Sequence, residues 1–173
     1  DIYIGNGVSE LIVMAMQALL NNGDEMLIPA PDYPLWTAAV TLAGGAPSHY
    51  LCDENNGWYP DLADIEAKIT EKTRGIVVIN PNNPTGTLLN KKSLLDFCKS
   101  HDSSAVIFSD EAYYDFITEP EYPSMVELVK EDRNIIVSKT FSKVYGMAGL
   151  RIGYLIAKPE IARNLKSAVM ANT

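Results

Sequence analysis

The sequence predicts an α/β fold of three layers (αβα), in which a mainly parallel, seven-stranded sheet lies between two layers of helices. Short runs of β-branched residues alternate with segments of helical periodicity along the chain. Such alternation is typical of parallel strands joined by right-handed helical crossovers. The chain has 173 residues, of which 47% are hydrophobic, so it can bury one sizeable core and has little room for a second. We therefore expect residues 1–173 to form one domain.

Each predicted element follows from its local pattern. Strands are expected where short β-branched or aromatic runs are bounded by turn formers, and these are residues 1–5, 25–29, 47–51, 75–80, 104–110, 134–138 and 153–157. Helices are expected where apolar residues recur at helical spacing, and these are residues 8–20, 33–43, 62–72, 91–100 and 160–170. Ligands of such sheets bind beyond the carboxyl ends of the strands, so the residues just after each strand are the candidates for a functional site.

The segment after the sixth predicted strand carries the strongest chemical signal. It reads SKTFSKVYGMAGLR over residues 138–151, with Lys143 directly after a hydroxyl residue and Arg151 eight positions further on. A lysine that forms an imine must lose its proton near neutral pH, which burial or a nearby positive charge favours. Arg151 can supply that charge while holding a phosphate, to which Thr140 and Ser142 can also donate. The segment indicates pyridoxal 5'-phosphate (PLP), although a solvated lysine-rich loop also fits it.

Two loops in the first half of the chain fit the same ligand. Residues 5–7 form a glycine turn that opens a helix, and the free N–H groups of Val8 and Ser9 would favour an anion there. Ser9 fits an ordinary N-cap or first-turn residue equally well. After the second strand, a proline-rich loop presents two aromatic residues, of which we prefer Tyr33 to Trp36 for stacking on a pyridine ring. Either ring also fits packing beneath the loop.

Two loops in the middle of the chain supply polar groups for a ring. Asn83 lies in the turn-forming run 80–86, and on a rigid loop its amide can donate to the phenolic oxygen of the cofactor. Asp110 ends a buried strand, where a carboxylate needs a compensating partner, and a protonated pyridine nitrogen would be one. Glu111 fits that position equally well from the pattern alone. Tyr113 is placed to hydrogen-bond the ring oxygen together with Asn83.

Composition narrows the class of ligand. The net charge is −8 and no basic run is present, which argues against nucleic acid or an anionic membrane as a partner. No apolar run reaches the roughly 18 residues of a membrane span, and the first residues lack a basic signal-peptide segment. Cys52 and Cys98 are expected to be free thiols in a reducing cytoplasm, and His49 and His101 are too isolated for a metal site. Small molecules are therefore the expected ligands.

Three motifs now carry a family resemblance: residues 83–86 (NPTG), 110–113 (DEAY) and 142–151 (SKVYGMAGLR). In order and spacing they resemble the class I/II aminotransferases, PLP enzymes of the aspartate-aminotransferase fold, and the likeness spans the whole chain. It implies that the chain is their large PLP-binding domain, that Lys143 forms the imine (aldimine) and acts as general base, and that Asp110 pairs with the pyridine nitrogen. It further implies roles for the ring-binding residues Asn83, Tyr113 and Tyr33 and for the phosphate-binding residues Val8, Ser9, Thr140, Ser142 and Arg151. Lys139 is excluded, because the spacing to Arg151 favours Lys143.

The resemblance leaves the substrate open. Residues 1–86 look most like alanine-type aminotransferases, whereas the chain from Ser109 onward looks more like the histidinol-phosphate branch. Family members are more than twice as long, which implies that an N-terminal segment and a C-terminal small domain lie outside this sequence. We expect transfer of an amino group between an amino acid and a 2-oxo acid by a homodimer. A PLP-dependent carbon–sulfur lyase and a non-catalytic PLP-binding domain are the alternatives.

Overall fold

The computed structural model describes residues 1–170, so the last three residues of the predicted domain lie outside the described residues. Its strands are β1 (Ile2–Gly5), β2 (Glu25–Ala30), β3 (Ala46–Asp53), β4 (Tyr59–Pro60), β5 (Thr73–Ile79), β6 (Val106–Asp110), β7 (Ile135–Thr140) and β8 (Gly153–Ala157). Together they form one sheet in the order β1-β8-β7-β6-β5-β2-β3-β4. The five central strands, from β3 to β7 in that order, are parallel, while β8, β1 and β4 are antiparallel to their neighbours.

The mainly parallel sheet is confirmed, but it has one strand more than predicted. The seven predicted strands are present, and each end lies within two residues of its predicted position. The additional strand, β4, has two residues, one of which is Pro60, and pairs with β3 at the edge of the sheet. A run of two residues that includes a proline is too short to display the pattern of a strand.

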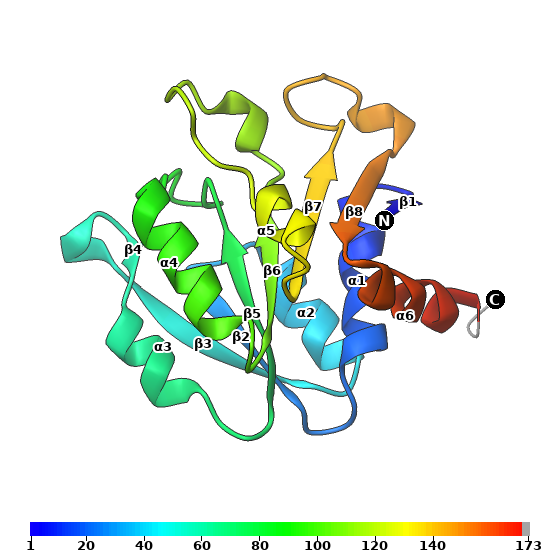
Figure 1. Cartoon of the computed structure of the whole chain (residues 1–173), viewed down its shortest axis with the longest axis horizontal. Helices are drawn as coiled ribbons and strands as arrows, with labels where there is room; N and C mark the ends of the chain where they lie inside the picture. Colours follow the sequence, from blue (N-terminus) through cyan, green and yellow to red (C-terminus); the bar gives the residue numbers. More distant parts are fainter. Residues whose placement is uncertain (171–173) are drawn as a thin grey trace.

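Helices cover both faces of the sheet, which confirms the three-layer prediction (Figure 1). One face is covered by α1 (Val8–Leu19), α2 (Leu35–Leu42) and α6 (Pro159–Met170). The other face is covered by α3 (Leu62–Lys68), α4 (Lys91–His101) and α5 (Val126–Lys130). Three single-turn 3-10 helices lie in the connections, η1 (Glu54–Asn56), η2 (Tyr114–Phe116) and η3 (Ala148–Leu150).

Three helices differ from their predicted form. The helix α2 begins at Leu35 rather than at residue 33, because the chain enters it through Pro34. The helix α3 ends at Lys68 rather than at residue 72, because Thr70 and Thr73 form a turn. The Thr70 N–H donates to Thr73 Oγ1, and the Thr73 N–H donates to Thr70 O. The helix α5 was not predicted, since five residues are too few to display helical periodicity.

The sheet divides the core into two parts, and successive residues of a strand point into different parts. On β6, Phe108 packs in the core beneath α1 and α2, whereas Ile107 packs in the core beneath α4 and α5. The same alternation continues to the end of the strand. It sends Asp110 to the side of Phe108 and the next residue, Glu111, to the side of Ile107.

Candidate active site

A cavity of about 270 Å³ lies at the carboxyl ends of the parallel strands. This volume is close to the lower limit of the usual range for small-molecule sites. The structure brings together at this cavity all ten predicted site residues: Val8, Ser9, Tyr33, Asn83, Asp110, Tyr113, Thr140, Ser142, Lys143 and Arg151. Sequence reasoning missed four further lining residues, Ile12, Ile79, Ala112 and Ala148, which are small or apolar and carry no chemical signal.

One end of the cavity is built to receive an anion. The helix α1 starts there, and the N–H groups of its first turn, including those of Val8 and Ser9, have no partner within the helix. Gly7 is the N-cap and Ser9 lies in the first turn of α1, so of the two ordinary readings of Ser9 the N-cap is wrong and the first-turn residue is confirmed. Arg151 lies against the same turn. A Cβ added to Gly7, whose φ is +84°, would stand 2.5 Å from Arg151 Nη2, so the close approach of the guanidinium requires glycine.

The floor of the cavity contains a buried carboxylate. Asp110 is 6% exposed, and its Oδ1 accepts hydrogen bonds from Ser138 Oγ at 3.0 Å and from the Ala112 N–H at 3.1 Å. Burial raises the pKa of Asp110, and these two donors and the indole N–H of Trp36 oppose that rise. No Lys or Arg of the described residues forms an ion pair with Asp110. A cation that entered the cavity would supply the compensation that the fold itself leaves out.

The rim of the cavity carries an amide, a phenol and an amine. Asn83 Nδ2 donates to Tyr113 Oη at 3.1 Å, which joins the loops that follow β5 and β6. Lys143 is exposed, and its Nζ lies 5.0 Å from the centre of the Tyr113 ring. The amine, the phenol and the amide therefore face one small volume.

The structure separates the pairs that the sequence left open. Glu111 turns away from the cavity and forms an ion pair with Lys139, with 2.9 Å between Oε2 and Nζ. Tyr33 is 41% exposed and lines the cavity, whereas Trp36 is fully buried in the core. A residue that sequence reasoning missed is Ser138, whose partner Asp110 lies opposite it on the neighbouring strand.

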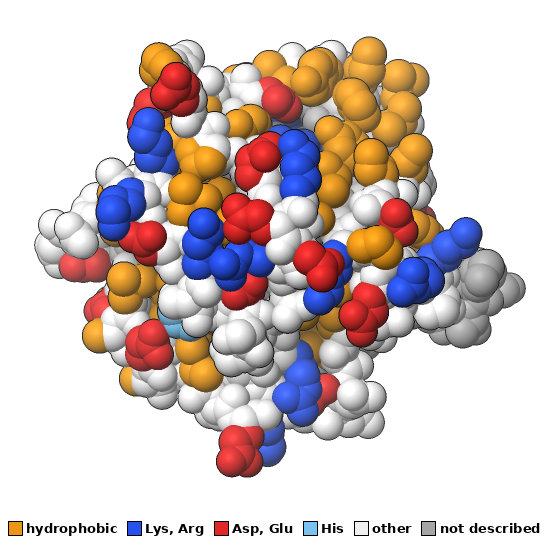
Figure 2. Space-filling model, viewed as in Figure 1, with side chains coloured by type: hydrophobic (Ala, Val, Ile, Leu, Met, Phe, Trp, Pro, Cys, Tyr) orange, Lys and Arg blue, Asp and Glu red, His pale blue; other side chains and the backbone are white. Residues whose placement is uncertain are grey.

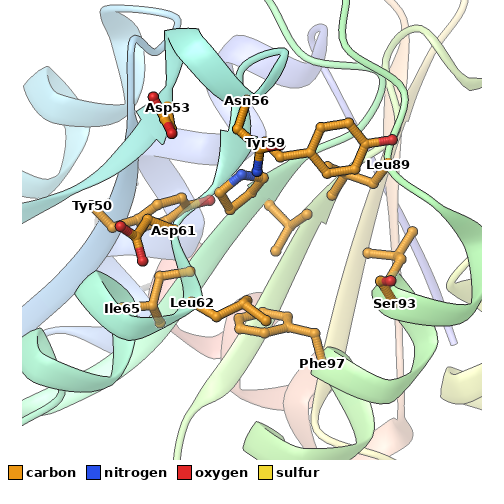
Figure 3. A pocket seen from close by; sticks show the side chains of 13 residues that line it. Tyr50, Asp53, Asn56, Tyr59, Asp61, Leu62, Ile65, Leu89, Ser93 and Phe97 are labelled. Carbon is orange, nitrogen blue, oxygen red and sulfur yellow. The ribbon is translucent and has the colours of Figure 1, made fainter.

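A larger cavity of about 470 Å³ lies on the other face of the sheet, between α3 and α4 (Figure 3). None of the predicted site residues lines it. Its polar groups bond mainly to the protein itself: Tyr50 Oη donates to Val77 O, Tyr59 Oη donates to Leu88 O, and Asp61 accepts from the first turn of α3. The smaller cavity therefore holds the candidate site residues, even though it is not the largest.

Comparison with known proteins identifies the family. The model of the family described as aminotransferase class I and II matches residues 1–173. The chain belongs to this family.

Two curated aminotransferases illustrate the range of its relatives. The glutamate-pyruvate aminotransferase AlaA of Escherichia coli strain K12 is 54% identical over 157 residues, which is 90% of this chain and 39% of that protein. The histidinol-phosphate aminotransferase of Moorella thermoacetica is 39% identical over 166 residues, 95% of this chain and 42% of that protein. The chain thus spans about two fifths of the length of the curated aminotransferases it matches.

The fold agrees with a solved member of the family. The crystal structure of an aminotransferase from Escherichia coli superimposes with a TM-score of 0.89 at 50% sequence identity. The match covers 99% of this chain and 44% of the other chain. The family resemblance predicted from the three sequence motifs is confirmed.

The class I and II aminotransferases are generally PLP-dependent, and the donor set of the cavity fits that cofactor. The first turn of α1, with Thr140, Ser142 and Arg151, suits a phosphate dianion. Asp110 suits a protonated pyridine nitrogen, because it is a buried carboxylate without a cationic partner among the described residues. Lys143 suits the aldehyde carbon, since a lysine amine is the nucleophile that forms imines with carbonyl groups.

Proposed function

We propose that the whole protein is a PLP-dependent aminotransferase and that residues 1–173 form its large, cofactor-binding domain. The single observation that carries the proposal is the buried Asp110 carboxylate, which has neutral donors but no cation among the described residues. It stands in one cavity with a phosphate-type anion site and a lysine. Bound PLP would act as an electron sink for the bonds at the substrate Cα.

The residues of the cavity divide the work of binding. Val8, Ser9, Thr140, Ser142 and Arg151 anchor the phosphate, and the left-handed backbone of Arg151, with φ of 52°, turns its side chain back to the start of α1. Tyr33 covers the ring from the rim. Asn83 and Tyr113, which are hydrogen-bonded to each other, would bind the ring oxygen, and Asp110 would keep the ring nitrogen protonated.

Lys143 has the two chemical tasks. Its Nζ would hold the cofactor, and its free amine would take the proton from the substrate Cα and return it after the transfer. Its exposed position beside Tyr113 gives the amine room to move between these two tasks.

The substrates we propose are an amino acid and a 2-oxo acid, with glutamate and pyruvate as the first pair to test. The reason is the name and the 54% identity of the Escherichia coli relative. The two cysteines are buried free thiols, which suits a reducing cytoplasm. Among the described residues, no helix is long and apolar enough to cross a membrane.

We also propose that the protein is a homodimer. Figure 2 shows a broad hydrophobic area over the loop that joins β7 and β8. The exposed apolar side chains of this loop and of β1 form what we call the loop patch: Ile2, Ile4, Val144, Tyr145, Met147 and Leu150. Large exposed apolar patches mark interaction surfaces. Light scattering of the whole protein and of its Leu150→Glu variant tests the proposal, which a monomeric wild type would refute.

The cofactor assignment is tested by absorbance and mass mapping. The chain mixed with PLP should absorb as an imine, and borohydride reduction should fix the label on the peptide that contains Lys143. Lys143→Ala should abolish the label, and the mapping must exclude Lys139, which lies four positions earlier. Label on another lysine would overturn the assignment. Label without amino transfer in the whole protein would favour the lyase or the non-catalytic binding domain.

A further inference from the structure

We propose that Trp36 is a positioning residue for Asp110, and that it directs its indole N–H towards the Asp110 carboxylate from the helix α2 on the same face of the sheet. Only the expected effect on PLP affinity rests on the proposed function. The interaction between Trp36 and Asp110 can be tested without the cofactor.

The first observation is a polar atom without a partner. Trp36 lies in the first turn of α2 and is 0% exposed. Its Nε1 is buried, and no acceptor among the described residues meets hydrogen-bond geometry with it. Buried donors are rarely left without an acceptor, so an indole N–H in this position calls for one.

The second observation is where the indole ring lies. It packs edge-on against Phe108, with 4.7 Å between the ring centres and 75° between the ring planes. Phe108 precedes Asp110 by two positions on β6, so both side chains leave the strand on the same face. The indole therefore lies on the same face of the sheet as the carboxylate.

The third observation is an acceptor with unused capacity. The two hydrogen bonds to Asp110 from Ser138 and Ala112 both end on Oδ1. A carboxylate accepts about four hydrogen bonds through two oxygens, so it has room for the indole N–H as well as for a ligand. The indole N–H of Trp36 lowers the pKa of Asp110, as the donors Ser138 and Ala112 do.

The groups that act on the charge of Asp110 come from the neighbouring residue, from the cavity and from α2. Glu111, the next residue, raises the pKa of Asp110. Lys143, Arg151 and Tyr113 face it across the cavity. From the α2 side, Trp36 contributes a neutral dipole rather than a charge. It therefore favours the ionised carboxylate without neutralising it, which leaves the charge available to a ligand.

The experiment is a pH titration of the chain by NMR without PLP. The chain has two tryptophans, and Trp58, on the η1–β4 connection, serves as the internal reference. The indole N–H resonance of Trp36 should move with the same midpoint as the Asp110 carboxyl carbon. It should stop titrating in Asp110→Asn, while that of Trp58 stays unchanged. A Trp36 resonance that ignores the carboxyl titration overturns the proposal.

Trp36→Phe gives an independent test, because it keeps a ring against Phe108 and removes the N–H. The carboxyl midpoint of Asp110 should rise in Trp36→Phe and stay unchanged in the matched control Trp58→Phe. PLP affinity should fall about 3- to 10-fold, the usual worth of one hydrogen bond. An unchanged midpoint in a folded Trp36→Phe chain refutes the inference. If the midpoint rises but PLP never labels Lys143, the inference survives and the proposed function fails.

Discussion

Two acidic residues stand next to each other at the end of β6, and the protein holds them in opposite ways. Glu111 is 3% exposed and has a complete set of partners, since Lys139 Nζ lies at 2.9 Å, Ser124 Oγ at 2.7 Å and the Met125 N–H at 2.6 Å. Asp110 is 6% exposed, and within residues 1–170 it accepts hydrogen bonds only from Ser138 and Ala112, both neutral. Similar burial thus comes with very different compensation.

The same division extends to the lysines and tyrosines around them. Lys139 is 13% exposed in its side chain, and its Nζ lies 3.9 Å above the centre of the Tyr114 ring. Lys143 and Tyr113 lie instead on the cavity side. We call Glu111, Lys139 and Tyr114 the closed side, and Asp110, Lys143 and Tyr113 the open side. The closed side holds the 111–125 loop, and the open side leaves its charges for a ligand.

The largest expected effect comes from breaking the closed side. Lys139→Met leaves the Glu111 charge buried without its cation, and such a loss typically costs about 3–5 kcal/mol. Lys143→Met makes the same substitution four positions later at an exposed residue, and should change the free energy of unfolding by less than about 0.5 kcal/mol. Urea denaturation of the two variants measures the difference. Equal losses would mean that the two sides do not differ in stability.

A smaller effect is expected when the charge on the open side is removed. Asp110→Asn keeps the shape of the side chain and takes away the charge that would pair with the ring nitrogen in the proposed site. A hydrogen bond to a charged group is worth about 1.5–3 kcal/mol, so PLP affinity should fall about 10- to 100-fold. Titration of PLP followed by absorbance gives the affinity. An unchanged affinity would show that Asp110 does not contact the ring.

The two sides also show where prediction from the sequence ends. The strand pattern predicts that Asp110 and Glu111 both end a buried strand, and alternation predicts that they face opposite ways. It does not predict which face carries the cavity. That depends on Lys139, which is 28 positions from Glu111 in the chain, and on the helices that cover each face. The family motif selected Asp110 without this information.

The positions of Trp36 and Ser138 near Asp110 also depend on contacts between residues that are distant in the sequence. Trp36 looked like an alternative to Tyr33 because both lie in one proline-rich loop. The helix begins at Leu35, so Trp36 is turned into the core while Tyr33 stays outside it. Ser138 was missed because a serine within an apolar strand has no chemical signal until its neighbour across the strand pair is known. The order of the strands, in contrast, was enough to bring ten residues to one edge.

The charge on the open side should also show in the pH dependence of the free energy of unfolding. Burial raises the pKa of Asp110 above its ordinary value of 3.8, so the folded chain favours the neutral form. That contribution to stability is complete below pH 3.8 and is lost as the pH rises through the raised value. Asp110→Asn should therefore match the wild type in acid and have a higher Tm than the wild type at neutral pH.

The control for this prediction is Glu111→Gln, the corresponding change on the closed side. It should lower the Tm at neutral pH, because it removes the Glu111 charge and leaves the Lys139 charge without its partner. Thermal unfolding of both variants without PLP, at several pH values, gives the comparison. A destabilised Asp110→Asn at neutral pH would mean that Asp110 has a cationic partner within the protein.

The smallest effect separates the two tyrosines. Tyr114 Oη donates to Tyr122 O at 2.8 Å, so Tyr114→Phe should cost about 0.5–1.5 kcal/mol of stability. Tyr113 Oη only accepts from the partly buried Asn83 amide at 3.1 Å, and solvent can replace that bond, so Tyr113→Phe should cost less. In the presence of PLP, Tyr113→Phe should cost more stability than Tyr114→Phe, because of these two tyrosines only Tyr113 contacts the ring oxygen in the proposed site. A PLP absorbance band that shifts in Tyr114→Phe and stays unchanged in Tyr113→Phe would contradict the assignment of the sides.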